Sequence, residues 1–256
     1  MALIFLLVHP SPRVIAPALD GPDPLHVQGV TFYSLFCYTS PSMPSFKNHL
    51  DGKTLRNRYY AMRHGFSEGN EKRIVNGDPR FGIAGFDVIP EGERQIIESV
   101  RRSPLMKLMQ YKPIRIYTSQ FRRAVTTAII AKELLTIEDP IIATPALNER
   151  YFGPGREGKS PSEDYYREVW ELDQKNPSHT DGCAESAWSV ADRMTRLIAH
   201  ELEVIHKDIV LLLVGHGDSC GIGQAMFEGK DPSQHHAVTG GSFKNAEIRE
   251  LLLNKK

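Results

Sequence analysis

The feature that most constrains the fold is a run of six apolar residues, 209–214, that no polar side chain interrupts. A continuous apolar run of this length is typical of a strand that other elements cover on both faces. Three shorter runs of β-prone residues, 58–62, 114–117 and 141–143, are candidates for further strands. The sequence therefore predicts a sheet whose centre is buried.

Segments with helical periodicity separate these strands. A helix opens at Pro90-Glu91-Gly92-Glu93 and continues towards residue 105, and apolar residues at helical spacing predict further helices over 121–135, 162–174 and 185–205. The tail, 237–253, offers two or three shorter strands. Strands that alternate with helices predict an α/β fold, a three-layer α/β/α sandwich with a mainly parallel central sheet.

The first 52 residues differ from the rest of the chain. They are rich in proline, and the apolar stretch 2–8 lacks the preceding Lys or Arg of a signal peptide. We expect residues 1–52 to form a poorly structured N-terminal extension and residues 53–256 to form one domain. A cleaved targeting segment, or a misassigned start of the reading frame, is the alternative for the extension.

Composition narrows the choice of partner and compartment. Lys and Arg number 31 and so do Asp and Glu, which argues against a nucleic-acid partner. No stretch approaches the roughly 20 apolar residues of a membrane span. The three cysteines, Cys37, Cys183 and Cys220, are odd in number and lack metal-ligand spacing, so we expect free thiols in a reducing compartment, the cytoplasm.

Three of the predicted strands end in residues that suit phosphate chemistry. The first ends at Arg63-His64-Gly65, the second is followed by Arg122 and Arg123, and the apolar run leads into Gly215-His216-Gly217. Ligands bind at the carboxyl edge of open α/β sheets, where these ends meet. An Arg in the first turn of a helix also combines a guanidinium group with free backbone N–H groups, which together favour an oxyanion.

Four elements, in this order along the chain, resemble motifs of the histidine phosphatase (phosphoglycerate mutase-like) superfamily, branch 1. The string Arg63-His64-Gly65-Phe66-Ser67-Glu68-Gly69-Asn70 is similar to RHGxSxxN. Residues 118–124 are similar to TSxLxRA, residues 147–153 to LxExxxG, and His216-Gly217-Asp218-Ser219 to HGxS. This resemblance implies a metal-independent phosphomonoester hydrolase that works through a phosphohistidine intermediate and needs no cofactor.

The resemblance also implies a role for each matching residue. His64 is the expected nucleophile, Glu149 the expected proton donor, and the expected phosphate ligands are Arg63, Arg123 rather than Arg122, His216, Asn70, Ser67 and Gly217. From the residues alone, Glu149 could instead be a loop carboxylate paired with Arg150. Asp218 would bring negative charge close to the phosphate unless it points away or meets Arg150, and it is the alternative proton donor.

Several functions remain open within the superfamily. Its mutases carry a tandem arginine pair and a tyrosine three residues after the acid, whereas this chain has no such pair in 153–182 and has Phe152 at that position. We therefore favour a phosphatase of small phosphorylated metabolites over a phosphoglycerate mutase, a sugar bisphosphatase or a protein-binding scaffold. The segment 153–179 is the expected lid, with Phe152, Tyr165, Tyr166 and Trp170 available to line it. The pair His235-His236 is not expected to bind a metal, because neighbouring side chains on a strand point in opposite directions.

Overall fold

The computed structural model describes residues 30–32, 46–160, 165–180 and 183–254. Six strands form one sheet in the order β1-β4-β3-β5-β2-β6. Their bounds are β1 Val30–Phe32, β2 Arg58–Arg63, β3 Ile114–Thr118, β4 Ile141–Ala143, β5 Val210–Gly215 and β6 Ile248–Leu251. Neighbouring strands are parallel except for β6, which is antiparallel to β2. The predicted, mainly parallel sheet is confirmed.

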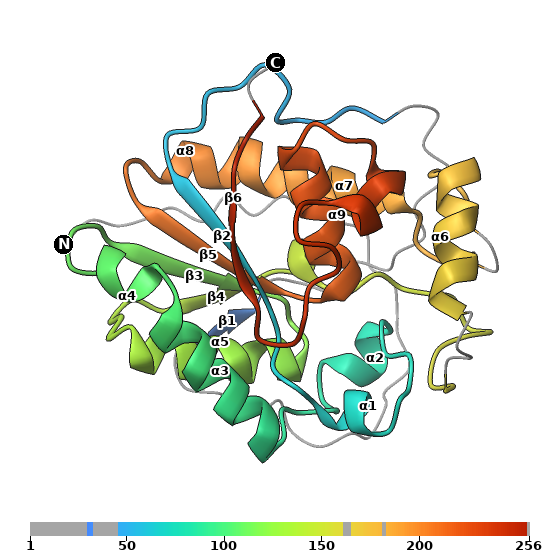
Figure 1. The fold of residues 1–256 in the computed structure, drawn as a ribbon, viewed down its shortest axis with the longest axis horizontal. Helices are drawn as coiled ribbons and strands as arrows, with labels where there is room; N and C mark the ends of the chain where they lie inside the picture. The colour runs from blue at the N-terminus through green and yellow to red at the C-terminus, as the bar shows by residue number, and fades with distance from the viewer. Residues whose placement is uncertain (1–29, 33–45, 161–164, 181–182, 255–256) are drawn as a thin grey trace, which may run out of the picture.

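Helices cover both faces of this sheet. Figure 1 shows α7, α8 and α9 on one side and α3, α4 and α5 on the other. The α-helices are α1 Glu68–Glu71, α2 Pro79–Gly82, α3 Pro90–Arg102, α4 Leu105–Leu108, α5 Arg122–Leu134, α6 Tyr165–Lys175, α7 Ala187–Arg196, α8 Glu203–Ile205 and α9 Gly217–Phe227. Two short 3-10 helices are η1 Pro145–Leu147 and η4 Pro232–Ala237, and η3 Leu197–Leu202 is π-helical. The three-layer sandwich is confirmed.

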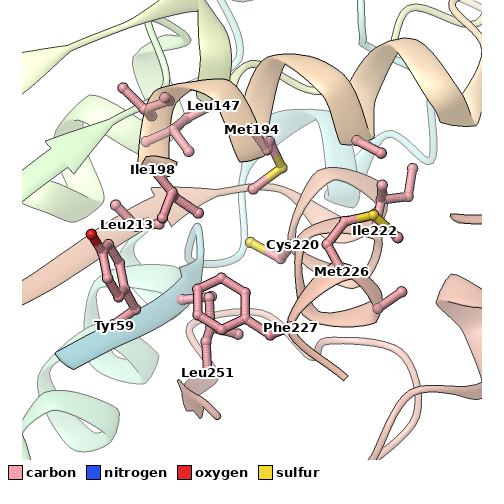
Figure 2. Close-up of a cluster of buried hydrophobic side chains, with 14 of the residues drawn as sticks. Tyr59, Leu147, Met194, Ile198, Leu213, Cys220, Ile222, Met226, Phe227 and Leu251 are labelled. Carbon is pink, nitrogen blue, oxygen red and sulfur yellow. The ribbon is translucent and has the colours of Figure 1, made fainter. Parts of the chain in front are cut away.

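The central strand β5 explains the uninterrupted apolar run. All six of its residues are buried, and alternate side chains enter two different clusters. Leu211 and Leu213 pack with residues of α7 and α9, in the cluster that Figure 2 shows. Val210, Leu212 and Val214 pack on the opposite face against residues of α3 and α5. Both faces of β5 are therefore covered, which requires an apolar side chain at each position.

The helix predicted over 185–205 consists of three parts. α7 runs into the π-helical η3 and then into α8 without leaving the helical region of the backbone. A π segment changes the helical repeat locally, a change that the apolar spacing does not reveal. Leu197, Ile198 and Leu202 of η3 are buried against the same cluster as α7.

The tail differs from the prediction of two or three strands, because residues 237–253 contain only β6. The Arg249 side chain donates to the main-chain oxygens of Thr239, Gly240, Gly241 and Ser242, so these carbonyls bond to a guanidinium group rather than to a neighbouring strand. Gly240 and Gly241 have φ values of 86° and 69°, a left-handed conformation that a strand does not contain. The pair His235-His236 lies on η4 and not on a strand.

Two described parts of the expected extension contact the domain. Val30–Phe32 is the edge strand β1, which pairs with β4. Leu50 is 1% exposed within the cluster of α7 and α9, and Asn48 Nδ2 donates to Met226 O at 3.0 Å. Within these stretches the segment 1–52 carries more structure than its sequence predicts. The boundary at residue 52 stays a prediction.

No helix of the described residues is long and apolar enough to span a bilayer. Cys183 is exposed and Cys220 is buried, and both are free thiols. Cys37 lies outside the described residues.

Candidate active site

The carboxyl ends of the parallel strands surround a cavity of about 390 Å³. Because β2, β3 and β5 run in parallel, the residues that follow them meet at one edge of the sheet. The cavity is lined by Arg63, His64, Ser67, Gly69, Asn70, Arg73, Ile74, Asn76, Arg123, Glu149, Phe152, Trp170, Gly217, Asp218, Gly221, His235, Ser242 and Phe243. Every residue expected in the site lines it except His216.

The turn after β2 is held close to the start of α3. A Cβ atom on Gly65 would lie 2.7 Å from Ile96 Cδ1 and 2.8 Å from Gly92 O, so only glycine fits there. Gly92 is subject to the same constraint, because its Cβ would lie 2.1 Å from Phe66 O. The two glycines allow α3 to pack on the turn that presents His64 to the cavity.

The His64 ring is fixed in one tautomer by its two neighbours. Its Nδ1 lies 2.7 Å from Gly65 O, which can only accept, so Nδ1 carries the proton. Arg123 Nε donates to His64 Nε2 at 3.1 Å, so Nε2 carries a lone pair. Burial, and then the positive charges of Arg123 and Arg63, hold the pKa of His64 well below its usual value. The ring is therefore neutral, with Nε2 as its free base.

Two guanidinium groups stand beside this nitrogen. Arg123 also donates through Nη2 to Asn76 O at 2.8 Å, which fixes its orientation. Arg63 Nη1 donates to Phe243 O at 2.7 Å, and its buried Nε has no hydrogen-bond partner among the described residues. Arg122 is bonded to Asp87 on the outer surface instead. The choice of Arg123 over Arg122 therefore agrees with their positions.

His216 lies behind His64 rather than on the cavity wall. Its ring is fully buried and its centroid lies 5.1 Å from that of His64, in an edge-to-face arrangement. His216 Nε2 is 2.8 Å from Ser119 Oγ, and the burial of the ring, followed by the charge of Arg123, lowers its pKa well below the usual value. A direct contact of His216 with phosphate stays a prediction.

The helix α9 begins directly after His216. Ideal Cβ placement on Gly217 puts that atom 3.6 Å from Arg63 Cζ, so the first turn of α9 stands next to the Arg63 guanidinium group. N–H groups in the first turn of a helix have no partner within the helix and attract anions. A contact of the Gly217 backbone with phosphate stays a prediction.

Asn70 offers a further donor. Its Oδ1 accepts from the backbone N–H and the hydroxyl of Ser67 and from Asn245 Nδ2, at 3.0 to 3.1 Å. Because Oδ1 is occupied, Nδ2 is the group that Asn70 can offer to a ligand. Asn245, which also donates to His64 O at 3.3 Å, was not expected from the sequence.

Glu149 lies at the cavity wall, and two backbone N–H groups fix its carboxyl group. Its Oε1 accepts from the backbone N–H groups of Arg150 and Ser219, at 2.9 and 3.2 Å. Burial raises the pKa of Glu149, and the charge of Asp218 raises it further. Arg150 does not form the alternative salt bridge with Glu149, because its side chain is bonded to Asp173 and to Glu185 O.

Asp218 lies close to Arg150, which is one of the two arrangements that the sequence left open for its carboxylate. Asp218 Oδ2 lies 3.6 Å from Arg150 Nη1, and the Asp218 side chain is largely buried. Arg150 itself is fully buried and binds both oxygens of Asp173, at 2.6 and 2.8 Å. Arg150 therefore lies near two carboxylates, Asp173 and Asp218, and it offsets the negative charge of Asp218 only in part.

The outer wall contains residues that the sequence did not single out. Phe152 and Trp170 line the cavity as expected, whereas the side chains of Tyr165 and Tyr166 lie outside the described set. The unexpected members are Arg73, Asn76, His235, Ser242 and Phe243. These residues lie on irregular loops and on η4, where no periodic pattern marks them.

Among the described residues, no group of three or more His, Cys, Asp or Glu has an arrangement that could hold a metal ion.

Comparison with known proteins gives the same family. The sequence pattern of the Histidine phosphatase superfamily (branch 1) matches residues 59–256. Phosphoglycerate mutase 1 of Saccharomyces cerevisiae is 27% identical over 190 residues, which cover 62% of this chain and 72% of that protein.

Solved structures of this fold include several phosphatases. A mycobacterial glucosyl-3-phosphoglycerate phosphatase matches with a TM-score of 0.57 at 20% identity, over 76% of this chain and 89% of its own. A phosphoserine phosphatase from Entamoeba histolytica matches with a TM-score of 0.55 at 16% identity, over the same shares of the two chains. These likenesses show the fold. Since the family pattern covers more than half of the chain and includes all four motifs, the chain belongs to branch 1 of the histidine phosphatase superfamily.

Proposed function

We propose that the protein is a phosphomonoester hydrolase that works through a phosphohistidine on His64. The observation that carries this proposal is the tautomer of His64. Gly65 O accepts a hydrogen bond from Nδ1–H, and the unprotonated Nε2 accepts one from Arg123 Nε. A neutral imidazole nitrogen surrounded by two guanidinium groups suits nucleophilic attack on a phosphoryl group.

In the first step, His64 Nε2 attacks the phosphorus atom and the ester P–O bond breaks. Arg63, Arg123, Asn70 Nδ2 and the first turn of α9 are the donors available to the three equatorial oxygens. Glu149 gives its proton to the departing alkoxide, which leaves as an alcohol. The raised pKa of Glu149 favours the protonated form that this step requires.

In the second step, water cleaves the phosphohistidine. The Glu149 carboxylate, deprotonated by the first step, takes a proton from the attacking water. The P–N bond breaks, inorganic phosphate leaves, and His64 returns to its neutral form. Glu149 regains its proton, so the cycle closes with one water consumed.

The charges around the cavity favour hydrolysis over the mutase reaction. Three of the basic residues in the lid region, Arg156, Lys159 and Lys175, do not line the cavity, and the side chain of Arg167 lies outside the described set. Phe152 supplies no hydroxyl group. Arg73 lines the cavity, but at its exposed rim, and we infer that it does not retain a glycerate carboxylate between two phosphoryl transfers.

Phosphate release decides between these reactions. The purified protein should release inorganic phosphate from propyl phosphate and from p-nitrophenyl phosphate, with EDTA present and without loss of rate. A second assay follows the interconversion of 3- and 2-phosphoglycerate. This mutase reaction is the alternative to test because the chain resembles phosphoglycerate mutase 1 of Saccharomyces cerevisiae. Interconversion faster than phosphate release would identify a mutase, and activity that EDTA abolishes would contradict the metal-independent mechanism.

We assign the enzyme to a reducing compartment, the cytoplasm, on the strength of its free thiols.

A further inference from the structure

The cavity has two halves of opposite charge. The phosphate half consists of Arg63, His64, Asn70 and Arg123 with the first turn of α9. The leaving-group half consists of Glu149, Phe152, Trp170, Asp218 and His235. The second half is contiguous: Arg150 joins Asp218 to the Phe152 ring at 5.8 Å, and the rings of Trp170 and His235 are 6.0 Å apart.

Asp218 and His235 are polar groups of the leaving-group half that the proposed mechanism does not use, and His235 already contacts Asp173. The Asp218 side chain lines the cavity while the residue is only 8% exposed. Asp218 Oδ2 has no hydrogen-bond partner among the described residues. Arg150 Nη1, at 3.6 Å, is beyond hydrogen-bond distance and is already bonded to Asp173. A buried acceptor without a donor is rare in folded proteins, and it indicates a donor from beyond the described residues, which a ligand in the cavity can supply.

The surroundings of Asp218 define the chemistry of that donor. Arg150 partly offsets the charge of the carboxylate without a hydrogen bond to it, so the Asp218 carboxylate at the cavity wall keeps acceptor capacity for a hydroxyl or an ammonium group. The rings of Phe152 and Trp170 form the neighbouring wall. Aromatic faces pack well against the C–H groups of a polyol, and they also attract ammonium groups.

We propose that Asp218 accepts a hydrogen bond from the leaving group, which makes the site selective for phosphate esters of polyols, sugars and amino alcohols. The inference rests on the proposed function and names its substrate class. A leaving group with a carboxylate, such as glycerate, is disfavoured because Asp218 repels it and can only accept. Arg73 does not reverse this preference, since it follows α1 at the exposed rim and lies three residues beyond Asn70 of the phosphate half.

Four primary alkyl esters with different groups beyond the ester oxygen test this proposal. Glycerol 3-phosphate carries hydroxyl groups, phosphoethanolamine an ammonium group, and 3-phosphoglycerate a carboxylate, while propyl phosphate carries no donor. For the wild type, kcat/KM should be about tenfold or more higher for at least one donor-bearing ester than for propyl phosphate. The ester with the larger ratio identifies the hydroxyl or the ammonium group as the donor. For 3-phosphoglycerate, kcat/KM should lie below that of propyl phosphate.

Removal of Asp218 should abolish this selectivity. In Asp218→Ala, the ratio of kcat/KM for a donor-bearing ester to kcat/KM for propyl phosphate should fall to about one. Asp218→Asn should reduce this ratio partly, because its amide keeps one acceptor oxygen. Both variants should improve the use of 3-phosphoglycerate relative to propyl phosphate. The ratio cancels any effect of Asp218 on Glu149, which applies to all alkyl esters alike. Glu228→Gln removes one charge from the opposite end of α9 and should leave the ratio unchanged.

The same ratio can be measured without catalysis. Dissociation constants of the four esters for His64→Ala are measured by calorimetry, and their ratios to that of propyl phosphate report the leaving-group half, because all four esters share the same phosphate contacts. A wild type that binds the donor-bearing esters selectively but hydrolyses no ester would refute the proposed function and support the Asp218 contact. A ratio that stays the same in both Asp218 variants, or a wild type that prefers 3-phosphoglycerate, would overturn the proposal.

Discussion

The phosphate half of the cavity is attached to strand ends, whereas most of the leaving-group half lies on η4, on α6 and on the loop after η1, and only Asp218 of α9 follows a strand directly. Arg63 is the last residue of β2, and Arg123 lies in the first turn of α5 after β3. Phe152 and Trp170 belong to the long excursion between β4 and β5. The rigid sheet thus holds the groups that every phosphate ester needs, whereas the excursion, together with Asp218 of α9 and His235 of η4, holds the groups that distinguish one ester from another.

Among the variants that compare the two halves of the cavity, removal of the nucleophile should reduce activity the most. His64→Ala should reduce kcat by about 10⁴-fold or more on both propyl phosphate and p-nitrophenyl phosphate, because neither ester has another nucleophile available. His200→Ala, which replaces a histidine of the π-helical η3 away from the cavity, is the matched control and should behave as the wild type. A His64→Ala variant that keeps most of its activity would assign the nucleophile elsewhere.

The next effect tests whether the phosphate half acts on all esters alike. Arg123→Ala should reduce kcat/KM by about 10²- to 10³-fold on both esters, since Arg123 acts on the transferred phosphoryl group. Arg122→Ala, one residue away but bonded to Asp87, should leave both activities intact. If Arg122→Ala is as damaging as Arg123→Ala, the positions of the two guanidinium groups do not explain catalysis.

Arg123 also predicts a shift in the pH profile. The positive charge of Arg123 helps to lower the pKa of His64, so its removal raises that pKa. His64 must be neutral to attack, and activity falls as the pH drops through its pKa. The acid limb of kcat/KM should therefore move to higher pH in Arg123→Ala. An acid limb that stays in place would separate Arg123 from the ionisation of His64.

Loss of Glu149 should affect the two esters to different extents, because Glu149 acts on the leaving group and not on the phosphoryl group. Glu149→Gln should cost about 10²-fold on propyl phosphate and much less on p-nitrophenyl phosphate, whose leaving group departs without a proton. Because Glu149 must be protonated, activity on propyl phosphate should fall as the pH rises through its raised pKa. This alkaline limb should disappear in Glu149→Gln. Equal losses on both esters would make Asp218 the candidate proton donor.

The smallest effect concerns residues 1–52, where neither half of the cavity lies. Deletion of 1–45 should leave kcat unchanged on both esters. Deletion of 1–52 also removes Leu50 and Asn48 from the cluster that supports α9, so unfolding in urea should show a loss of about 2–5 kcal/mol. Leu50→Ala in the full chain is the matched variant. Loss of activity on deletion of 1–45 would show that the first segment belongs to the catalytic domain.

The sequence predicted the phosphate half more completely than the leaving-group half, for a physical reason. Strand ends and first helical turns leave a local pattern, and this pattern located Arg63, His64 and the pair Arg122-Arg123, from which the family resemblance selected Arg123. Asn245 and Ser119 were missed because they act over long separations: Asn245 donates to Asn70, and Ser119 contacts His216, at 2.8 Å. No local pattern encodes such a contact.

The leaving-group half was also predicted incompletely, because local sequence patterns do not locate its residues. Glu149 was identified by resemblance to a motif and not by periodicity. The prediction of two or three strands in the tail was wrong because Arg249 binds the carbonyls of the Gly240-Gly241 loop. That loop leads to Phe243, whose carbonyl accepts from Arg63. A side chain distant in sequence therefore decides how this part of the cavity is formed.

The most direct test of the account is to trap the phosphorylated enzyme. Radiolabelled p-nitrophenyl phosphate, quenched in denaturant after a few milliseconds, should leave a phosphoryl group that is labile in acid and stable in base. Peptide mapping should place it on His64, and Glu149→Gln should accumulate more of it because water attack lacks its base. Label that persists on His64→Ala, or that is stable in acid and labile in base, would contradict a phosphohistidine at the end of β2.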